Sequence, residues 1–177
     1  MRFVETDIVG AYLIYPELIQ DDRGFFARTW CRQEFSERGL DSEMSQCSIS
    51  YNKRCGTLRG MHYQQPPHSE VKLVRCTHGA IFDVIVDLRS DSPSQGRWFG
   101  CRLSSAERNA LYVPAGCAHG FLTLEDDSEV LYQMSAPHHA ESAAGVRWND
   151  PMFGIRWPLA VQVISERDDS YPDYEKK

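Results

Sequence analysis

Ile81-Phe82-Asp83-Val84-Ile85-Val86-Asp87-Leu88 is the stretch that decides the fold class of this chain. Phe82, Val84 and Val86 alternate along it and share one face of an extended segment. Such alternation is typical of a β-strand, because successive side chains of a strand point to opposite faces. The run from Val71 to Cys76, just before this stretch, alternates in the same way. The sequence therefore predicts two consecutive strands in the middle of the chain.

Similar short runs continue towards the C-terminus, and turn signals separate them. They are Trp98 to Leu103, Leu111 to Val113, Gly120 to Leu124 and Glu129 to Met134, with turns such as Ser90-Asp91-Ser92-Pro93 and Pro114-Ala115-Gly116. The clearest helix runs from Cys31 to Arg38, and Gly39 ends it. Many short strands at regular spacing predict an all-β fold, a sandwich or a jelly-roll barrel, with short peripheral helices.

The length of 177 residues suits one domain with a single core, so we expect residues 1–177 to form one unit. The net charge of −6 argues against a nucleic acid or an anionic membrane as a partner. No apolar run approaches the roughly 20 residues of a membrane span, and the first residues lack the apolar region of a signal peptide. The 6 cysteines are scattered without a CxxC pair, which is typical of reduced thiols. We therefore expect a cytoplasmic protein.

Three segments contain most of the side chains that could carry chemistry. They are Leu58 to Gln64, Glu70 to Val74 and Val113 to Phe121. Arg59 and His62 stand an odd number of steps apart, so on a regular strand they would face opposite ways. A bulge at Gly60 would bring them to the same face. The spacing alone leaves both arrangements open.

The spacing Pro-x-Gly-x-x-His at Pro114, Gly116 and His119 resembles the second motif of the cupin superfamily. The stretch Gly56 to His62 resembles the start of the first cupin motif. In metal-binding cupins a second His follows two residues after the His of this motif, and here, two residues after His62, that position is Gln64. The metal set of those cupins is therefore incomplete. A triad of two His and one carboxylate, made by His62, Glu70 and His119, remains an alternative iron site.

Nine segments, in order along nearly the whole chain, resemble the dTDP-4-dehydrorhamnose 3,5-epimerase family. They are Asp22 to Phe26, Leu58 to Gln64, Lys72 to Val74, Asp83 to Arg89, Ser92-Pro93, Pro114 to Phe121, Trp148 to Pro151, Ile155 to Pro158 and Ile164 to Asp168. The resemblance implies a cupin jelly roll, a homodimer, and neither a metal nor another cofactor. It also implies a substrate that is a nucleotide diphosphate carrying a 4-keto-6-deoxysugar, epimerised at C3, C5 or both.

The same resemblance implies the roles of five side chains. His62 resembles the base that removes a proton beside the ketone, and a neutral imidazole suits this step because its ordinary pKa lies near working pH. Asp168 resembles the carboxylate that orients the base. Lys72, helped by His119, resembles the cation at the enolate oxygen. Tyr132 resembles the acid that returns a proton to the other face.

Substrate binding is implied at seven further positions. Arg23 and Arg59 resemble the groups that bind the diphosphate, for which the planar guanidinium is well suited. Phe25 or Phe26 would stack on the nucleotide base, in one version from the partner subunit. Gln46, Ser48 and His138 occupy positions where the family contacts its ligand.

Several of those ligand positions depart from the family pattern. Ser48 stands where the family has Asn, His138 where it has Tyr, Arg28 where it has Glu, and Ala143 where it has Glu. The proton-transfer residues are retained, so the departures favour the same chemistry on an altered substrate. The nucleotide, the sugar or the number of inverted centres would then differ.

Two other functions fit the residues. One is a metal-dependent oxygenase or isomerase at His62, Glu70 and His119, and the other is a cupin that binds a sugar nucleotide without catalysis. Taken singly, each side chain also fits a structural role, Tyr132 as a core tyrosine and Lys72 as a solvated strand residue. The retention of His62, Lys72 and Tyr132 together argues for the epimerase.

Overall fold

The computed structural model describes residues 1–175, so the last two residues of the expected 1–177 domain lie outside the described part. Strands dominate it. They are β1 (Arg2–Glu5), β2 (Tyr12–Tyr15), β3 (Leu18–Asp21), β4 (Gly24–Ala27), β5 (Gln46–Asn52), β6 (Leu58–Gln64), β7 (Lys72–His78), β8 (Ala80–Asp87), β9 (Trp98–Ser104), β10 (Ala110–Val113), β11 (Cys117–Thr123), β12 (Ser128–Met134) and β13 (Ala143–Gly145). The helices are α1 (Arg32–Ser36), α2 (Glu166–Asp169) and the 3₁₀ turn Ala140–Ser142.

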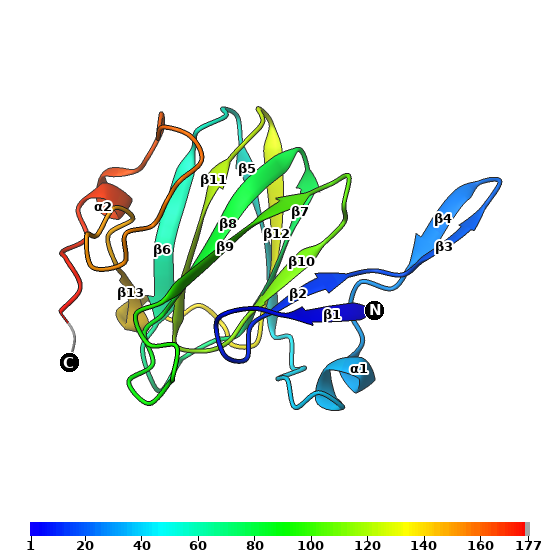
Figure 1. Ribbon diagram of the computed structural model, residues 1–177, viewed down its shortest axis with the longest axis horizontal. Helices are drawn as coiled ribbons and strands as arrows, with labels where there is room; N and C mark the ends of the chain where they lie inside the picture. The colour runs from blue at the N-terminus through cyan, green and yellow to red at the C-terminus, as the bar shows by residue number, and fades with distance from the viewer. Residues whose placement is uncertain (176–177) are drawn as a thin grey trace.

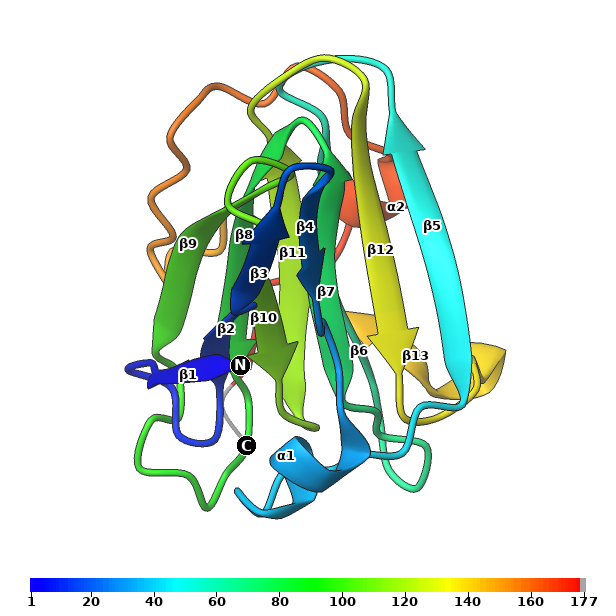
Figure 2. The same ribbon diagram turned by 90° about the vertical axis from the view of Figure 1, so that its right-hand side faces the viewer.

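Two antiparallel sheets pack face to face (Figures 1 and 2). One has six strands in the order β1-β2-β10-β7-β12-β5, and the other has five in the order β13-β6-β11-β8-β9. The core between them combines Val74 and Leu111 of the first sheet with Ile81, Ile85 and Phe121 of the second. This is the expected all-β architecture of the cupin jelly-roll kind, with short helices at its periphery.

Strand β8 is buried on both faces, whereas the alternation of Phe82, Val84 and Val86 indicated burial of one face only. Ile81 and Ile85 face the core between the sheets, whereas Val84 and Val86 pack on the other side with Phe153 of the C-terminal segment. A strand in the centre of a sheet that is covered on both sides needs apolar residues at both parities. The C-terminal segment therefore acts as a third layer over this part of the sheet.

The other predicted strands and the predicted helix are present with shifted bounds, whereas strands β1 to β5 and β13 were not predicted. Helix α1 is shorter than predicted, because Cys31 is its N-cap and Glu37 its C-cap. Strand β11 begins at Cys117 instead of Gly120, because Cys117 already pairs with Asp87 of β8 after the turn at Gly116. Val161 to Ser165 is an extended segment whose single bridge joins Val163 to Thr57. Within residues 1–175, no helix is long and apolar enough to cross a membrane.

Candidate active site

A bulge in β6 decides which side chains of this strand can act together. His119 of β11 is opposite His62, and Phe121 is opposite Arg59. Strand β6 therefore has one residue more than β11 between these two pairs, which is a β-bulge. Gly60 lies in this bulge with φ 137°, and a Cβ there would come within 2.5 Å of the Cα of Gly120. Only glycine fits such a close approach. The bulge directs Arg59 and His62 into one cavity. Of the two arrangements that the spacing left open, the structure thus has the one in which both side chains face the same way.

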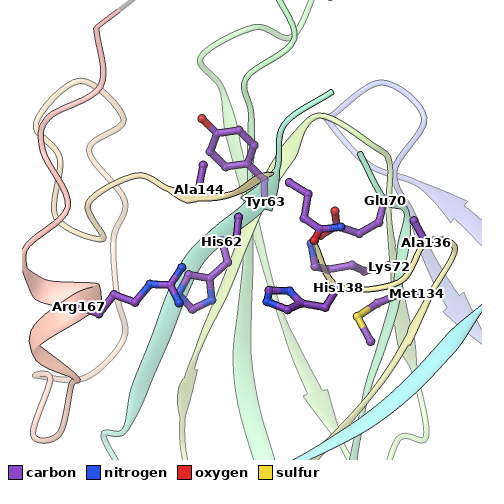
Figure 3. A pocket seen from close by; sticks show the side chains of 11 residues that line it. His62, Tyr63, Glu70, Lys72, Met134, Ala136, His138, Ala144 and Arg167 are labelled. Atoms are coloured by element: carbon purple, nitrogen blue, oxygen red, sulfur yellow. The ribbon is translucent and has the colours of Figure 1, made fainter. Parts of the chain in front are cut away.

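This cavity, of about 470 Å³, lies between the sheets at their open edge and collects most of the predicted site residues. It is lined by Gln46, Ser48 and Ser50 of β5, Arg59 and His62 of β6, Lys72 of β7, His119 and Phe121 of β11, Tyr132 and Met134 of β12, and by His138, Ser165, Arg167 and Asp168. A smaller cavity of about 170 Å³ adjoins it and shares His62, Lys72 and His138 with it (Figure 3).

The imidazole of His62 is held by the carboxylate of Asp168, with 2.8 Å between Nε2 and Oδ1. Asp168 is buried at the start of α2, where its N–H donates to Ser165 Oγ, and its Oδ2 accepts from the N–H of Gly60. Burial raises the pKa of Asp168, but the hydrogen bonds from His62 and Gly60 outweigh it and lower this pKa below its ordinary value. An ionised Asp168 accepts a hydrogen bond from Nε2 of a neutral His62, which leaves the ring lone pair on Nδ1.

A second imidazole–carboxylate pair lies deeper in the barrel. His119 Nε2 is 2.7 Å from Asp83 Oδ1, and both side chains are buried. Burial raises the pKa of Asp83, and the contact with His119 opposes this only in part. The ring of His119 also meets Tyr132 edge to face, with 6.1 Å between ring centroids. His119 is thereby fixed between the carboxylate and the phenol.

Tyr132 presents a protonated phenol to the cavity. Burial raises its pKa well above the ordinary value, and the negative charge of Asp83 acts in the same direction. The phenol therefore carries its proton at neutral pH. Lys72 lines the same cavity and forms a buried ion pair with Glu70.

The groups expected to contact the nucleotide form the wall contributed by β5. Gln46 and Ser48 lie opposite Met134 and Tyr132 of β12, and Gln46 Oε1 accepts a hydrogen bond of 3.0 Å from the N–H of His138. Arg59 donates through Nε to Asn52 at 2.8 Å. These expected contact residues therefore line the same cavity as His62 and Tyr132.

Three predicted residues do not reach this cavity. Arg23, Phe25 and Phe26 belong to the hairpin of β3 and β4, which projects away from the barrel (Figure 1). The Arg23 side chain is 90% exposed and pairs with Asp21, and Phe26 is 69% exposed. These residues do not line the cavity of their own chain, and the Phe25 ring instead packs against the guanidinium of Arg108, with 4.3 Å from Cζ to the ring centroid. The version in which Phe25 or Phe26 of a partner subunit stacks on the nucleotide base remains a prediction.

The structure adds two residues that the sequence reasoning missed. Arg167 directly precedes Asp168 on α2, lines both cavities, and donates through Nε to the hydroxyl of Tyr171 at 3.0 Å. Ser50 lines the larger cavity two residues after Ser48. Period-two alternation along 46–52 would have found Ser50, but that stretch was not predicted to be a strand.

The alternative metal site is not supported by the arrangement of its three proposed ligands. His62 bonds Asp168, His119 bonds Asp83 and Glu70 bonds Lys72, so each has a partner of its own. Within residues 1–175, no three His, Cys, Asp or Glu side chains gather in a way that could hold a metal ion. Two of these pairs join an imidazole to a carboxylate, and the third joins an ammonium to one.

The fold and the cavity thus define a jelly-roll protein with an acid–base site between its sheets. The family model described as dTDP-4-dehydrorhamnose 3,5-epimerase matches residues 5–176. The chain belongs to this family of sugar-nucleotide epimerases, which are isomerases.

Individual relatives agree over nearly the full length. The dTDP-4-dehydrorhamnose 3,5-epimerase of Sinorhizobium fredii is 42% identical over 173 residues, covering 97% of this chain and 89% of that protein. The crystal structure of the enzyme from Elizabethkingia anophelis is 34% identical with a TM-score of 0.96, covering 98% of this chain and 96% of that one. The Bacillus anthracis enzyme, solved with TDP and PPi bound, is 38% identical with a TM-score of 0.94, covering 98% and 99%.

Proposed function

We propose that this protein epimerises a nucleotide-activated 4-keto-6-deoxysugar at C3, C5 or both, in deoxysugar biosynthesis. One observation carries the proposal: the His62–Asp168 pair and the Tyr132 phenol line the same cavity from different sheets. A base and an acid on separate walls suit an enolate that loses a proton from one face and gains one on the other.

The chemistry follows from these groups. Nδ1 of His62 accepts the proton from the carbon beside the ketone. The electron pair of that C–H bond forms the C=C bond of the enolate, and the π pair of the C=O bond moves to the oxygen. Lys72, with His119 beside it, stabilises the negative charge on this oxygen. Tyr132 then donates its proton to the opposite face of the carbon, and solvent restores the two protonation states.

The nucleotide diphosphate is proposed to lie along Gln46, Ser48 and Arg59, with Arg167 as a second guanidinium. Both arginines line the larger cavity. A planar guanidinium group can bind two phosphate oxygens at once. Ser48 and His138, which depart from the family pattern, line the larger cavity, and Ala143, which also departs from it, lines the smaller one. We therefore propose that the nucleotide or the sugar differs from that of the family pattern.

A homodimer in the cytoplasm completes the proposal. The projecting hairpin exposes Ile19 and Phe26, at 68% and 69%, which is costly for a monomer in water. If this hairpin docks on a partner subunit, Arg23, Phe25 and Phe26 of one subunit would lie at the cavity of the other. Sedimentation at micromolar concentration is expected to give a dimer, and a monomer there would contradict this part.

The deciding experiment for activity is proton NMR in deuterium oxide with a panel of 4-keto-6-deoxysugar nucleotides, dTDP-linked and otherwise. We expect deuterium to enter at C3, C5 or both, together with inversion, without added metal. Binding without exchange would favour the non-catalytic cupin, and exchange that requires a stoichiometric metal would favour the metal-dependent enzyme.

A further inference from the structure

The ring of Tyr171 lies on the backbone of Gly145, beside the proposed base. Tyr171 follows helix α2, and a Cβ on Gly145 would overlap the ring atoms Cζ and Cε2 of Tyr171. Gly145 is directly opposite His62 in the pairing of β13 with β6. Side chains of directly opposite residues lie on the same face of a sheet. The ring of Tyr171 therefore occupies the space that a side chain at position 145 would take next to His62.

The same ring contacts the imidazole of His62. The two rings meet edge to face, with 6.1 Å between their centroids and 69° between their planes. Asp168 of α2 holds Nε2 of this imidazole at 2.8 Å. Both contacts come from the C-terminal segment, one as a hydrogen bond and the other as a ring contact. This segment therefore sets the orientation of a side chain that is otherwise 42% exposed.

The hydroxyl of Tyr171 orients a second group of the site, the guanidinium of Arg167. Among residues 1–175, this hydroxyl is the one group to which the Arg167 side chain donates a hydrogen bond, from Nε at 3.0 Å. A guanidinium has five N–H donors, so a bond at Nε leaves both Nη groups for another acceptor. Figure 3 shows the Arg167 side chain extending towards His62, and both residues line both cavities. The hydroxyl thus holds this cation at the cavity wall beside the base.

We propose that Tyr171 is a positioning residue that sets the spacing between His62 and Arg167. This inference rests on the proposed function, in which Arg167 binds the diphosphate and His62 removes the proton. A substrate held at its diphosphate presents the reacting carbon correctly only if these two groups are fixed relative to each other. A misplacement of about 1 Å can cost on the order of 10²-fold in rate. Tyr171 contacts both groups with one side chain and lines neither of the two cavities.

Tyr171→Phe tests the hydroxyl alone, because it keeps the ring beside His62. Arg167 then loses its fixed orientation, so KM for deuterium exchange should rise about 5-fold, the typical effect of one hydrogen bond, while kcat stays within about 2-fold. The dissociation constant of inorganic pyrophosphate, measured by calorimetry, should rise by the same factor. The matched control is Tyr112→Phe, whose hydroxyl accepts a hydrogen bond from the backbone outside the two cavities, and it should change neither constant. Unchanged KM and pyrophosphate affinity in Tyr171→Phe overturn the proposal.

Removal of the ring tests its contact with His62. Tyr171→Ala should lower kcat for exchange by on the order of 10-fold or more, in addition to the rise in KM, because the imidazole loses one of its two fixed contacts. Gly145→Ala should act in the same way, since its Cβ would displace the ring. The double variant should lose little more than either single variant, because the added methyl group then meets no ring. Additive losses of kcat, or wild-type kcat in Tyr171→Ala, contradict a role through His62.

Gly100→Ala is the control for crowding between a strand glycine and an aromatic ring. A Cβ on Gly100 of β9 would lie 2.5 Å from the ring of Phe82, and neither residue lines the two cavities. This variant should be less stable in urea, with kcat and KM of the folded protein unchanged. Circular dichroism checks that each variant is folded under the assay conditions. If Gly145→Ala does not fold, Tyr171→Ala decides the contribution of the ring.

The failure of the proposed function would be recognised separately. If the unmodified protein exchanges no protons with any 4-keto-6-deoxysugar nucleotide, that function fails. Pyrophosphate binding by Tyr171→Phe then still decides whether Tyr171 orients Arg167. If the unmodified protein does not bind pyrophosphate, Arg167 holds no diphosphate and the proposal is overturned.

Discussion

His62 and Asp168 stand 106 residues apart in the sequence, and in the fold His62 Nε2 lies 2.8 Å from Asp168 Oδ1. Asp168 bonds the N–H of Gly60 with its other oxygen, so one carboxylate fixes both the ring and the bulge beside it. The side chain of His62 remains 42% exposed towards the cavity, whereas that of Asp168 is buried. The geometry thus joins an accessible imidazole to a buried carboxylate.

Replacement of the base should abolish the proton transfer and leave the fold intact. We expect His62→Ala to lower deuterium exchange at every inverted carbon by about 10²- to 10⁴-fold or more, which is the range of a general base. Asp168→Asn should cost less, because the imidazole survives but loses its fixed tautomer. NMR of the substrate in deuterium oxide measures both variants, and circular dichroism checks the fold. Exchange at the wild-type rate in His62→Ala would exclude His62 as the base.

Removal of the Tyr132 hydroxyl should separate exchange from inversion. Tyr132→Phe keeps the ring against His119 and Phe121, so packing changes little. His62 can still form the enolate and return a solvent proton to the same face, so deuterium should enter faster than the configuration inverts. The measurement scores label and configuration at each carbon beside the ketone. Equal losses of both would show that Tyr132 is not simply the opposite-face acid.

Lys72→Ala provides the contrasting variant. Lys72 is proposed to stabilise the enolate that both outcomes share, so exchange and inversion should fall together, by on the order of 10²-fold. The ratio of the two rates should therefore remain at the wild-type value. A change in this ratio would assign Lys72 to proton delivery instead.

A side chain at Gly60 should disrupt the bulge that holds Arg59 and His62 in one cavity. Gly60→Ala places a Cβ 2.5 Å from the Cα of Gly120 in addition to the strain of a positive φ. Gly24→Ala is the control, since Gly24 has a similar φ of 127° with nothing within 4 Å of its Cβ position. We expect Gly60→Ala to lower the free energy of unfolding in urea by several kcal/mol, about twice the loss in Gly24→Ala or more. Equal losses of unfolding free energy in the two variants would show that the strain of a positive φ accounts for the effect and that the close approach to Gly120 does not.

The ionised carboxylate of Asp87 should stabilise the folded protein, and this contribution to the free energy of unfolding should be lost when acid protonates the carboxylate. Burial raises its pKa, but hydrogen bonds from Arg89, Ser92 and Ser94 outweigh this and lower the pKa to about 2. The folded pKa lies below the unfolded value of about 3.9, so this stability is present above about pH 4 and is lost as the pH falls towards 2.

Urea unfolding at pH 6 and near pH 2 measures this contribution. Asp87→Asn should be destabilised at pH 6, and the pH dependence of its unfolding free energy should be smaller by about 2 kcal/mol than that of the unmodified protein. Other carboxylates titrate alike in both proteins, so the difference isolates Asp87. An identical pH dependence would contradict the role of this network.

The sequence by itself determined the class of fold and the chemical groups of the site. Alternation along 81–88 and the runs after it predicted an all-β protein, because a strand that faces a core must repeat with a period of two. The motif residues His62, Lys72, His119, Tyr132 and Asp168 all line one cavity. Their roles as base, cation and acid remain predictions for the experiments above.

Only the tertiary structure decided how these groups pair and which of them can meet. The bulge at Gly60, the Glu70–Lys72 pair and the place of Arg167 all depend on contacts with distant strands or on burial by them. The projecting hairpin separates Arg23 and Phe26 from the cavity of their own chain. A local pattern reports which face of a segment is apolar, but not its register against a strand 60 residues away. Burial of both sheets selects that register, and with it the partner of each charged side chain.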